Sequence, residues 1–200
     1  MGDIPIATSP KLSEPLPDSE PLSEPAFAPS AYKAADIAEI LRERGWLISS
    51  EVTLTAEQEA WCGRAAGLLG PQAADRDALA DLLSLVFCYD AQALLQQAES
   101  QAVLMRKGSR EVVRALANLL LDGGDVDSNR FQEIVEGIKA AVPYRSRSLF
   151  QPIRLALAGR AGEGEMDRVI LLLDDAAGVP FATPVKGTHQ RMLEFCAAFD

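Results

Sequence analysis

From residue 31 onward, hydrophobic side chains recur at the 3.6-residue spacing of amphipathic helices. Ile37, Ile40 and Leu41 share one face of a helix predicted over residues 33–44, which Gly45 ends. No segment of useful length alternates apolar and polar residues as a strand does. Each later helix is predicted to begin at a capping residue or at a proline tolerated in the first turn. These starting positions are Thr55, Asp75, Asp90, Ser109, Asp127 or Ser128, Pro152, and Thr188.

The pattern therefore predicts an all-α protein of eight or nine short helices. We expect two successive small helical bundles, over residues 31–100 and 101–200, that divide near residues 97–108. Residues 1–30 hold seven prolines and three Ser-Glu-Pro motifs. Such a segment lacks the apolar surface and the backbone donors that folding requires, so we expect a disordered tail. The alternatives for this tail are a short linear motif for a partner and a linker from an upstream segment.

The charge balance changes the picture more than the overall composition does. The chain has 19 Lys and Arg against 29 Asp and Glu, a net charge of −10, which argues against a protein that coats nucleic acid through bulk charge. Residues 139–160 nevertheless hold five basic residues and no acidic one. These side chains either balance acids brought near by folding or form a surface that contacts phosphates.

Membrane and metal chemistry find little support in the sequence. The first ten residues lack the basic start and apolar run of a secretory signal, and no apolar run approaches the ~18 residues that span a bilayer, so we expect a cytoplasmic protein. A zinc site would need Cys62, Cys88, Cys196 and His189 to converge, because no Cys-x-x-Cys pair is present. We expect no metal or cofactor.

Catalytic groups are equally sparse. His189, the only histidine, precedes the last predicted helix and is interpreted as a solvated residue near its cap. The stretch Gly162–Glu165 lacks the Gly-Lys-Ser/Thr ending of a phosphate loop, and its carboxylates would repel phosphate, so a flexible turn is expected. Asp174 and Asp175, and the acids between residues 122 and 127, are interpreted as helix caps.

One segment resembles a known family. Residues 148–160, SLFQPIRLALAGR, resemble the Leu-Phe-x-Pro-apolar-Arg-x-Ala-Leu-x-Gly signature near the C-terminus of bacterial glutamyl-tRNA synthetases. Residues 79–90 and 130–140 resemble two further helices of that region. The resemblance covers residues 40–200 and implies the helical cage of the family's anticodon-binding region. The family's His-x-Gly-His and Lys-Met-Ser-Lys motifs are missing from this sequence, which implies that this chain alone is not an enzyme.

The resemblance also implies where RNA would be contacted. The candidate residues on the signature helix and the adjacent turns are Arg145, Arg147, Gln151, Arg154, Arg160, Gly164 and Met166. Arg154 would read a base edge or clamp a phosphate, and Met166 would pack on an unstacked base. For Arg154 the alternative is a helix-packing role, held by a carbonyl or carboxylate. Glu163 and Glu165 depart from the family pattern and place negative charge in this turn.

The sequence thus leaves three functions open. The first is a stand-alone, non-catalytic relative of the anticodon-binding region that binds tRNA or a tRNA-like RNA through residues 139–166. The second is an adaptor that kept the fold, lost RNA binding and engages a protein such as a synthetase. The third is the tRNA-binding part of a split synthetase whose catalytic half is a separate chain.

Overall fold

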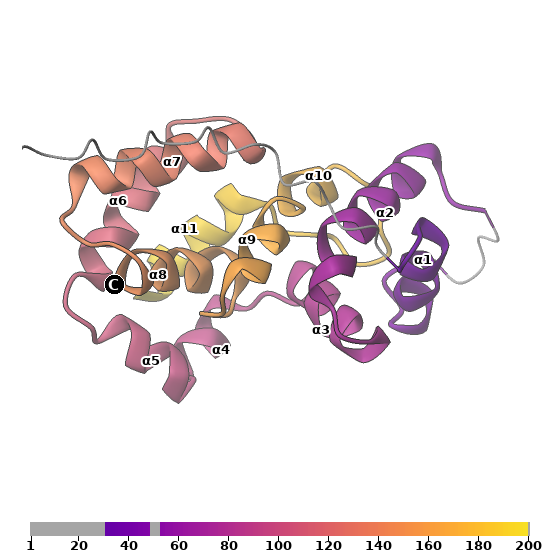
Figure 1. The fold of residues 1–200 in the computed structure, drawn as a ribbon, viewed down its shortest axis with the longest axis horizontal. Helices are drawn as coiled ribbons and strands as arrows, with labels where there is room; N and C mark the ends of the chain where they lie inside the picture. Colours follow the sequence, from indigo (N-terminus) through magenta and orange to yellow (C-terminus); the bar gives the residue numbers. More distant parts are fainter. Residues whose placement is uncertain (1–30, 49–52, 200) are drawn as a thin grey trace, which may run out of the picture.

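The computed structural model describes residues 31–48 and 53–199, and every regular element in these two ranges is a helix. The predicted tail, residues 1–30, lies outside the described residues. The all-α prediction is confirmed. The helices, shown in Figure 1, are α1 (Ala34–Glu43), α2 (Ala56–Leu69), the 3-10 helix η1 (Gly70–Gln72), α3 (Arg76–Phe87), α4 (Ala91–Gln96), α5 (Ala98–Leu104), α6 (Ser109–Leu121), α7 (Ser128–Ala141), α8 (Arg147–Ala158), α9 (Gly164–Ile170), α10 (Leu173–Ala177) and α11 (Thr188–Phe199).

The helices form two ends, and α9 lies between them (Figure 1). Helices α1, α2 and α3 lie at one end, whereas α4 to α8 lie at the other (Figure 1). Helix α9 packs against α2, α3 and α8, and α11 packs against α4, α6 and α8. The buried apolar residues form one cluster that runs from α1 to α11. The division into two bundles at about residue 100 stays a prediction.

The predicted helix starts are largely confirmed, because the expected caps make their bonds. The Thr55 hydroxyl accepts from the Gln58 amide at 3.2 Å, and the Gln58 side chain returns a bond to the Thr55 amide, which completes a capping box. Asp75, Asp90 and Asp127 each accept a backbone N–H of the first turn that follows them. These bonds satisfy amide donors that have no partner inside the helix.

The prediction at Pro152 was wrong by one turn and a half. Helix α8 begins at Arg147, so Pro152 is its sixth residue instead of a first-turn residue. Proline lacks the N–H that would bond the carbonyl four residues earlier, yet the helix continues because the surrounding side chains bury Leu149, Ile153 and Leu155. The turn expected at Gly162–Glu165 likewise ends early, since Gly164 is already the first residue of α9.

Asp174 ties three segments together through hydrogen bonds to one carboxylate. Its Oδ1 accepts from the Thr188 amide at 2.6 Å, and its Oδ2 accepts from the Thr188 hydroxyl and the Val126 amide, both at 2.7 Å. A residue of α10 therefore caps the first turn of α11 and fixes the loop before α7. The interpretation of Asp174 as a cap is confirmed, although it caps a different helix from its own.

A fully buried arginine of α11 connects this helix to α3 and α8. Arg191 of α11 is 0% exposed, and its guanidinium donates to the carbonyls of Val86, Leu157 and Lys186 at 2.6 to 2.8 Å. Its Cζ lies 4.6 Å from the centroid of the Tyr89 ring. Burial lowers the pKa of Arg191 to about 10, which leaves the group charged at neutral pH. Val86 and Leu157 lie in the last turns of α3 and α8, where carbonyls lack helical partners and the helix dipole favours a cation.

Candidate nucleic-acid interface

The signature helix α8 places Arg154 against the following turn instead of toward solvent. The guanidinium Nε and Nη2 donate to the two carboxylate oxygens of Asp167, each at 2.7 Å, and Nη1 donates to the Gly162 carbonyl at 3.1 Å. Only 14% of the Arg154 side chain is exposed, and its Cζ lies 5.0 Å from the Phe150 ring centroid. All three guanidinium nitrogens are used, so this geometry favours the helix-packing role over contact with a base.

The structure places Met166 in the core instead of at the surface. Its side chain is 1% exposed, because α9 turns its apolar face toward the core that it shares with α8. A base could not reach it without opening that core. Gly164 is exposed at the start of α9, in open space where an added Cβ would touch nothing.

The remaining cations of residues 139–160 contact acids outside this segment or carbonyls within it. Arg147 pairs with Glu163 at 3.2 Å, Arg160 pairs with Asp81 at 3.5 Å, and Lys139 pairs with Glu136 at 2.7 Å. Arg145 is exposed, and its Nη1 donates to the carbonyls of Val142 and Tyr144. The local excess of positive charge is therefore largely balanced in the folded molecule, with Arg145 as the exception.

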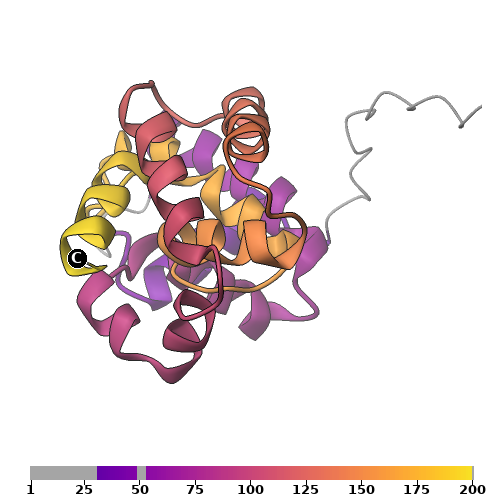
Figure 2. The same ribbon diagram turned by 90° about the vertical axis from the view of Figure 1, so that its left-hand side faces the viewer.

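A second group of cations, which is not among the candidates predicted from the sequence, lies beside Arg145. The loop from α5 to α6 carries exposed Arg106 and Lys107, and the first turn of α6 carries exposed Arg110. Within the two described ranges, none of these three side chains forms an ion pair. We call Arg106, Lys107, Arg110 and Arg145 the loop-end surface; Figure 2 views the molecule from this end.

Two contacts hold the loops of this surface together. The backbone of Gly108 is left-handed, with φ of +92°, and a Cβ there would overlap the Tyr144 ring that packs on it. Arg106 Nη1 donates to the side-chain carbonyl of Gln151. Gln151, a predicted contact residue, thus positions a neighbouring cation. A signal existed in the sequence, since residues 105–114 hold four basic residues and one acid.

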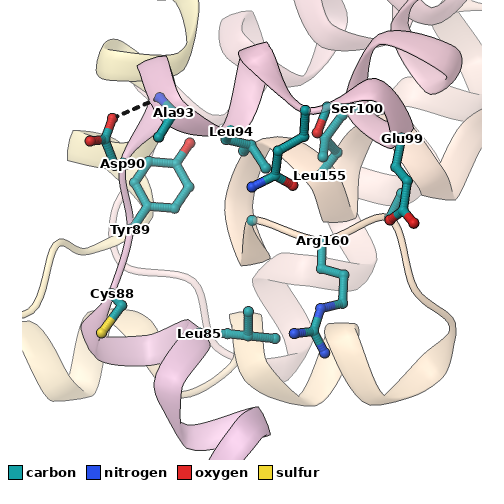
Figure 3. Close-up of a pocket in the computed structure, with 13 residues that line it drawn as sticks. Leu85, Cys88, Tyr89, Asp90, Ala93, Leu94, Glu99, Ser100, Leu155 and Arg160 are labelled. Atoms are coloured by element: carbon teal, nitrogen blue, oxygen red, sulfur yellow. Dashed lines mark hydrogen bonds between the residues drawn. The ribbon is translucent and has the colours of Figure 1, made fainter.

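Arg160 also lines a pocket of about 270 Å³ between α3, α4, α5 and the end of α8 (Figure 3). The polar groups around it already serve the fold. Asp90 caps α4, and the Tyr89 hydroxyl donates to the Ala156 carbonyl at 2.6 Å. Burial raises the pKa of Tyr89. We therefore assign no chemistry to this pocket.

The groups considered for metal or acid–base chemistry lie apart. Cys62 is buried, Cys88 is exposed and Cys196 is half-buried. His189 is the second residue of α11, not a loop residue, and its Nε2 lies 3.2 Å from the Leu121 carbonyl. Across residues 31–48 and 53–199, no three His, Cys, Asp or Glu side chains are grouped as metal ligands would be. No helix in the same part of the chain is long and apolar enough to cross a bilayer.

The buried thiol of Cys62 and the exposed thiol of Cys88 should differ sharply in reactivity. Burial raises the pKa of the Cys62 thiol from 9.0 to about 12, so at pH 8 its thiolate fraction falls roughly a thousandfold below that of an unperturbed thiol. We expect a thiolate-selective reagent to modify Cys88 quickly and Cys62 only upon unfolding. Stopped-flow absorbance on Cys88→Ser and Cys62→Ser checks this. A fast phase that survives Cys88→Ser and disappears in Cys62→Ser would contradict the assignment.

Comparison with known proteins gives one distant relative. The glutamate–tRNA ligase 2 of Syntrophus aciditrophicus (strain SB) is 26% identical to this chain over 97 residues, which cover 48% of the chain and 20% of the relative. The chain thus aligns with about a fifth of that protein. No protein-family model and no solved structure matches the chain. The similarity supports a distant relationship to a synthetase.

Proposed function

We propose that this protein is a stand-alone, non-catalytic module that binds tRNA or a tRNA-like RNA, and that the loop-end surface makes the contact. The observation that carries the proposal is the position of Arg106, Lys107 and Arg110 beside Arg145, exposed and without ion pairs in the described chain. Cations not engaged by carboxylates are the groups that displace counterions from a phosphate backbone. The distant similarity to a glutamate–tRNA ligase supports RNA of the tRNA class as the ligand.

The contacts between its segments also support the loop-end surface as the RNA contact. Two loops from different parts of the chain converge on it, and the Gly108–Tyr144 and Arg106–Gln151 contacts fix their relative positions. Fixed cations lose less conformational entropy on binding than cations on independent loops. The signature helix α8 then has a supporting role, because Gln151 orients Arg106 while Arg154 anchors the turn before α9.

A protein adaptor is the second candidate, favoured by the net charge of −10 and by the carboxylates that neutralise Arg147, Arg154 and Arg160. In that function, or as the RNA-binding part of a split synthetase, a separate chain would supply catalysis. Pull-down before and after nuclease treatment separates the adaptor from the RNA-binding module. A partner that survives nuclease, together with no RNA binding, would establish the adaptor.

The RNA proposal is tested by titrating total tRNA at several salt concentrations between about 50 and 200 mM. We expect saturable binding whose logarithm falls linearly with the logarithm of salt concentration. The triple variant Arg106→Ala, Lys107→Ala, Arg145→Ala should bind weakly and lower the magnitude of that slope by about 2 to 3, because each lost phosphate contact removes nearly one released counterion.

The matched control is Arg44→Ala. Arg44 is exposed at the end of α1, at the opposite end of the molecule from the loop-end surface (Figure 1). The substitution removes one positive charge and leaves that surface unchanged. We expect it to leave the slope unchanged. Equal losses in the triple variant and the control, or no saturable binding at 50 mM salt, would refute the proposal.

A further inference from the structure

A cavity opens beside the loop-end surface. Its volume of about 320 Å³ is at the lower end of the range of about 300 to 1,000 Å³ for small-molecule sites. It lies between the α5–α6 loop, the start of α6 and the end of α11. Met105 lines this cavity and is 83% exposed. No other large apolar side chain in the described residues is as exposed. The cavity is lined by three apolar side chains, two arginines, one carboxylate, an amide and a glycine: Leu104, Met105, Phe199, Arg106, Arg110, Glu111, Gln101 and Gly108.

Arg110 lines this cavity and makes a cation–π contact with Phe199. Its Cζ lies 4.9 Å from the centroid of the Phe199 ring, and Phe199 in turn packs on Phe195 with ring centroids 5.7 Å apart. Phe195 is fully buried, so the stack is anchored in the core. The aromatic ring contacts the guanidinium on one side while the residue as a whole stays exposed. The side of the guanidinium away from the ring is therefore open to a ligand.

We propose that this cavity binds one unstacked nucleobase of a single-stranded RNA loop. The base stacks on the outer face of Arg110 and against Met105, and the flanking phosphates lie toward Arg106 and Lys107. This proposal rests on the proposed function and names the RNA feature that the surface selects. Bases displaced from a helix stack on guanidinium planes and on apolar side chains, whereas a base inside a duplex offers neither face.

The charge and shape of the cavity favour a nucleobase over a peptide. An amphipathic helix would need a long apolar groove, whereas the apolar lining here is limited to Leu104, Met105 and Phe199. The charged side chains beside them are Arg106, Arg110 and Glu111. A phosphorylated peptide would use the cations and leave the Arg110–Phe199 stack without a partner. A base joined to phosphates matches both parts at once.

The decisive variant is Arg110→Lys, which keeps the charge and removes the planar face. The probes are a hairpin RNA with a seven-nucleotide loop and a blunt duplex with the same number of phosphates. We expect Arg110→Lys to bind the hairpin about 5- to 100-fold more weakly, with its salt slope unchanged, and to bind the duplex as the original protein does. Phe199→Leu should act in the same way, because it removes the ring that contacts the Arg110 guanidinium.

The matched control is Arg114→Lys, an exposed arginine one turn further along α6 that does not line the cavity. It should leave both affinities unchanged. If Arg110→Lys binds the hairpin normally while the triple variant of the loop-end surface loses binding, the RNA contact is purely electrostatic and the nucleobase site is wrong. If the triple variant loses nothing on either RNA, the proposed function itself fails. Equal weakening by Arg110→Lys of a phosphorylated peptide and of the hairpin would also overturn the nucleobase site.

Discussion

Replacing Arg191 by alanine is expected to lower the free energy of unfolding by about 3 to 5 kcal/mol. The substitution leaves the carbonyls of Val86, Leu157 and Lys186 without their donor in a site that no water reaches from the surface, since Arg191 is 0% exposed. It also leaves a cavity the size of the side chain. Urea denaturation followed by circular dichroism measures this loss.

Two further variants separate the causes. Arg191→Met fills much of the volume but donates no hydrogen bonds, so we expect most of the loss to remain. Arg191→Lys keeps a cation with fewer donors in a less extended geometry, so we expect an intermediate stability. Should Arg191→Met prove as stable as the original protein, the carbonyls do not depend on the guanidinium and the role given to Arg191 is wrong.

Replacing Arg154 by alanine is expected to cost about 2 to 4 kcal/mol of stability. Asp167 would lose both charge-assisted bonds while its side chain stays 23% exposed, and the Gly162 carbonyl would lose its donor. RNA affinity, measured well below the melting temperature, should stay close to that of the original protein. The reason is that the Arg154 guanidinium packs against the turn between α8 and α9 instead of facing solvent. Thermal unfolding and tRNA titration of the same variant give both numbers.

The control for Arg154 is Arg147→Ala, which removes an exposed ion pair only two turns earlier on α8. The side chains of Arg147 and Glu163 are 78% and 74% exposed, so we expect a loss of less than about 1 kcal/mol. A stable Arg154→Ala variant with weakened tRNA binding would reverse our assignment and return Arg154 to the interface.

Local rules account for the helices that the sequence predicted well. Thr55, Asp75, Asp90 and Asp127 are side chains that accept a nearby amide, so the information that places each helix start lies within three residues. Helix α8 was placed too late because Pro152 resembles a first-turn residue. Its start is decided by the burial of Leu149, a tertiary effect that a local rule does not contain.

The candidate site was harder to predict because the acid that neutralises a cation can come from a distant part of the sequence, and only the folded structure shows which one does. Arg160 meets Asp81 from α3, and Arg154 meets Asp167 from α9, so an acid-free segment became a balanced one. The loop-end surface arises in the same way, since Gly108 and Tyr144 bring together two loops that are far apart along the chain. Nothing in its sequence neighbourhood marked Arg191 as buried, because an arginine that directly follows the polar residues His189 and Gln190 also fits an exposed helix face.

Arg191 lies in α11, the last helix of the described chain, and this position affects when the core can close during synthesis. The last turns of α3 and α8 receive their common donor only from α11, which also packs on α4 and α6. A nascent chain that has emerged only as far as α10 lacks this donor and leaves the apolar faces beneath α11 uncovered. We therefore expect final closure of the core to follow synthesis of residues 188–199, and until then the exposed apolar faces favour aggregation of the nascent chain.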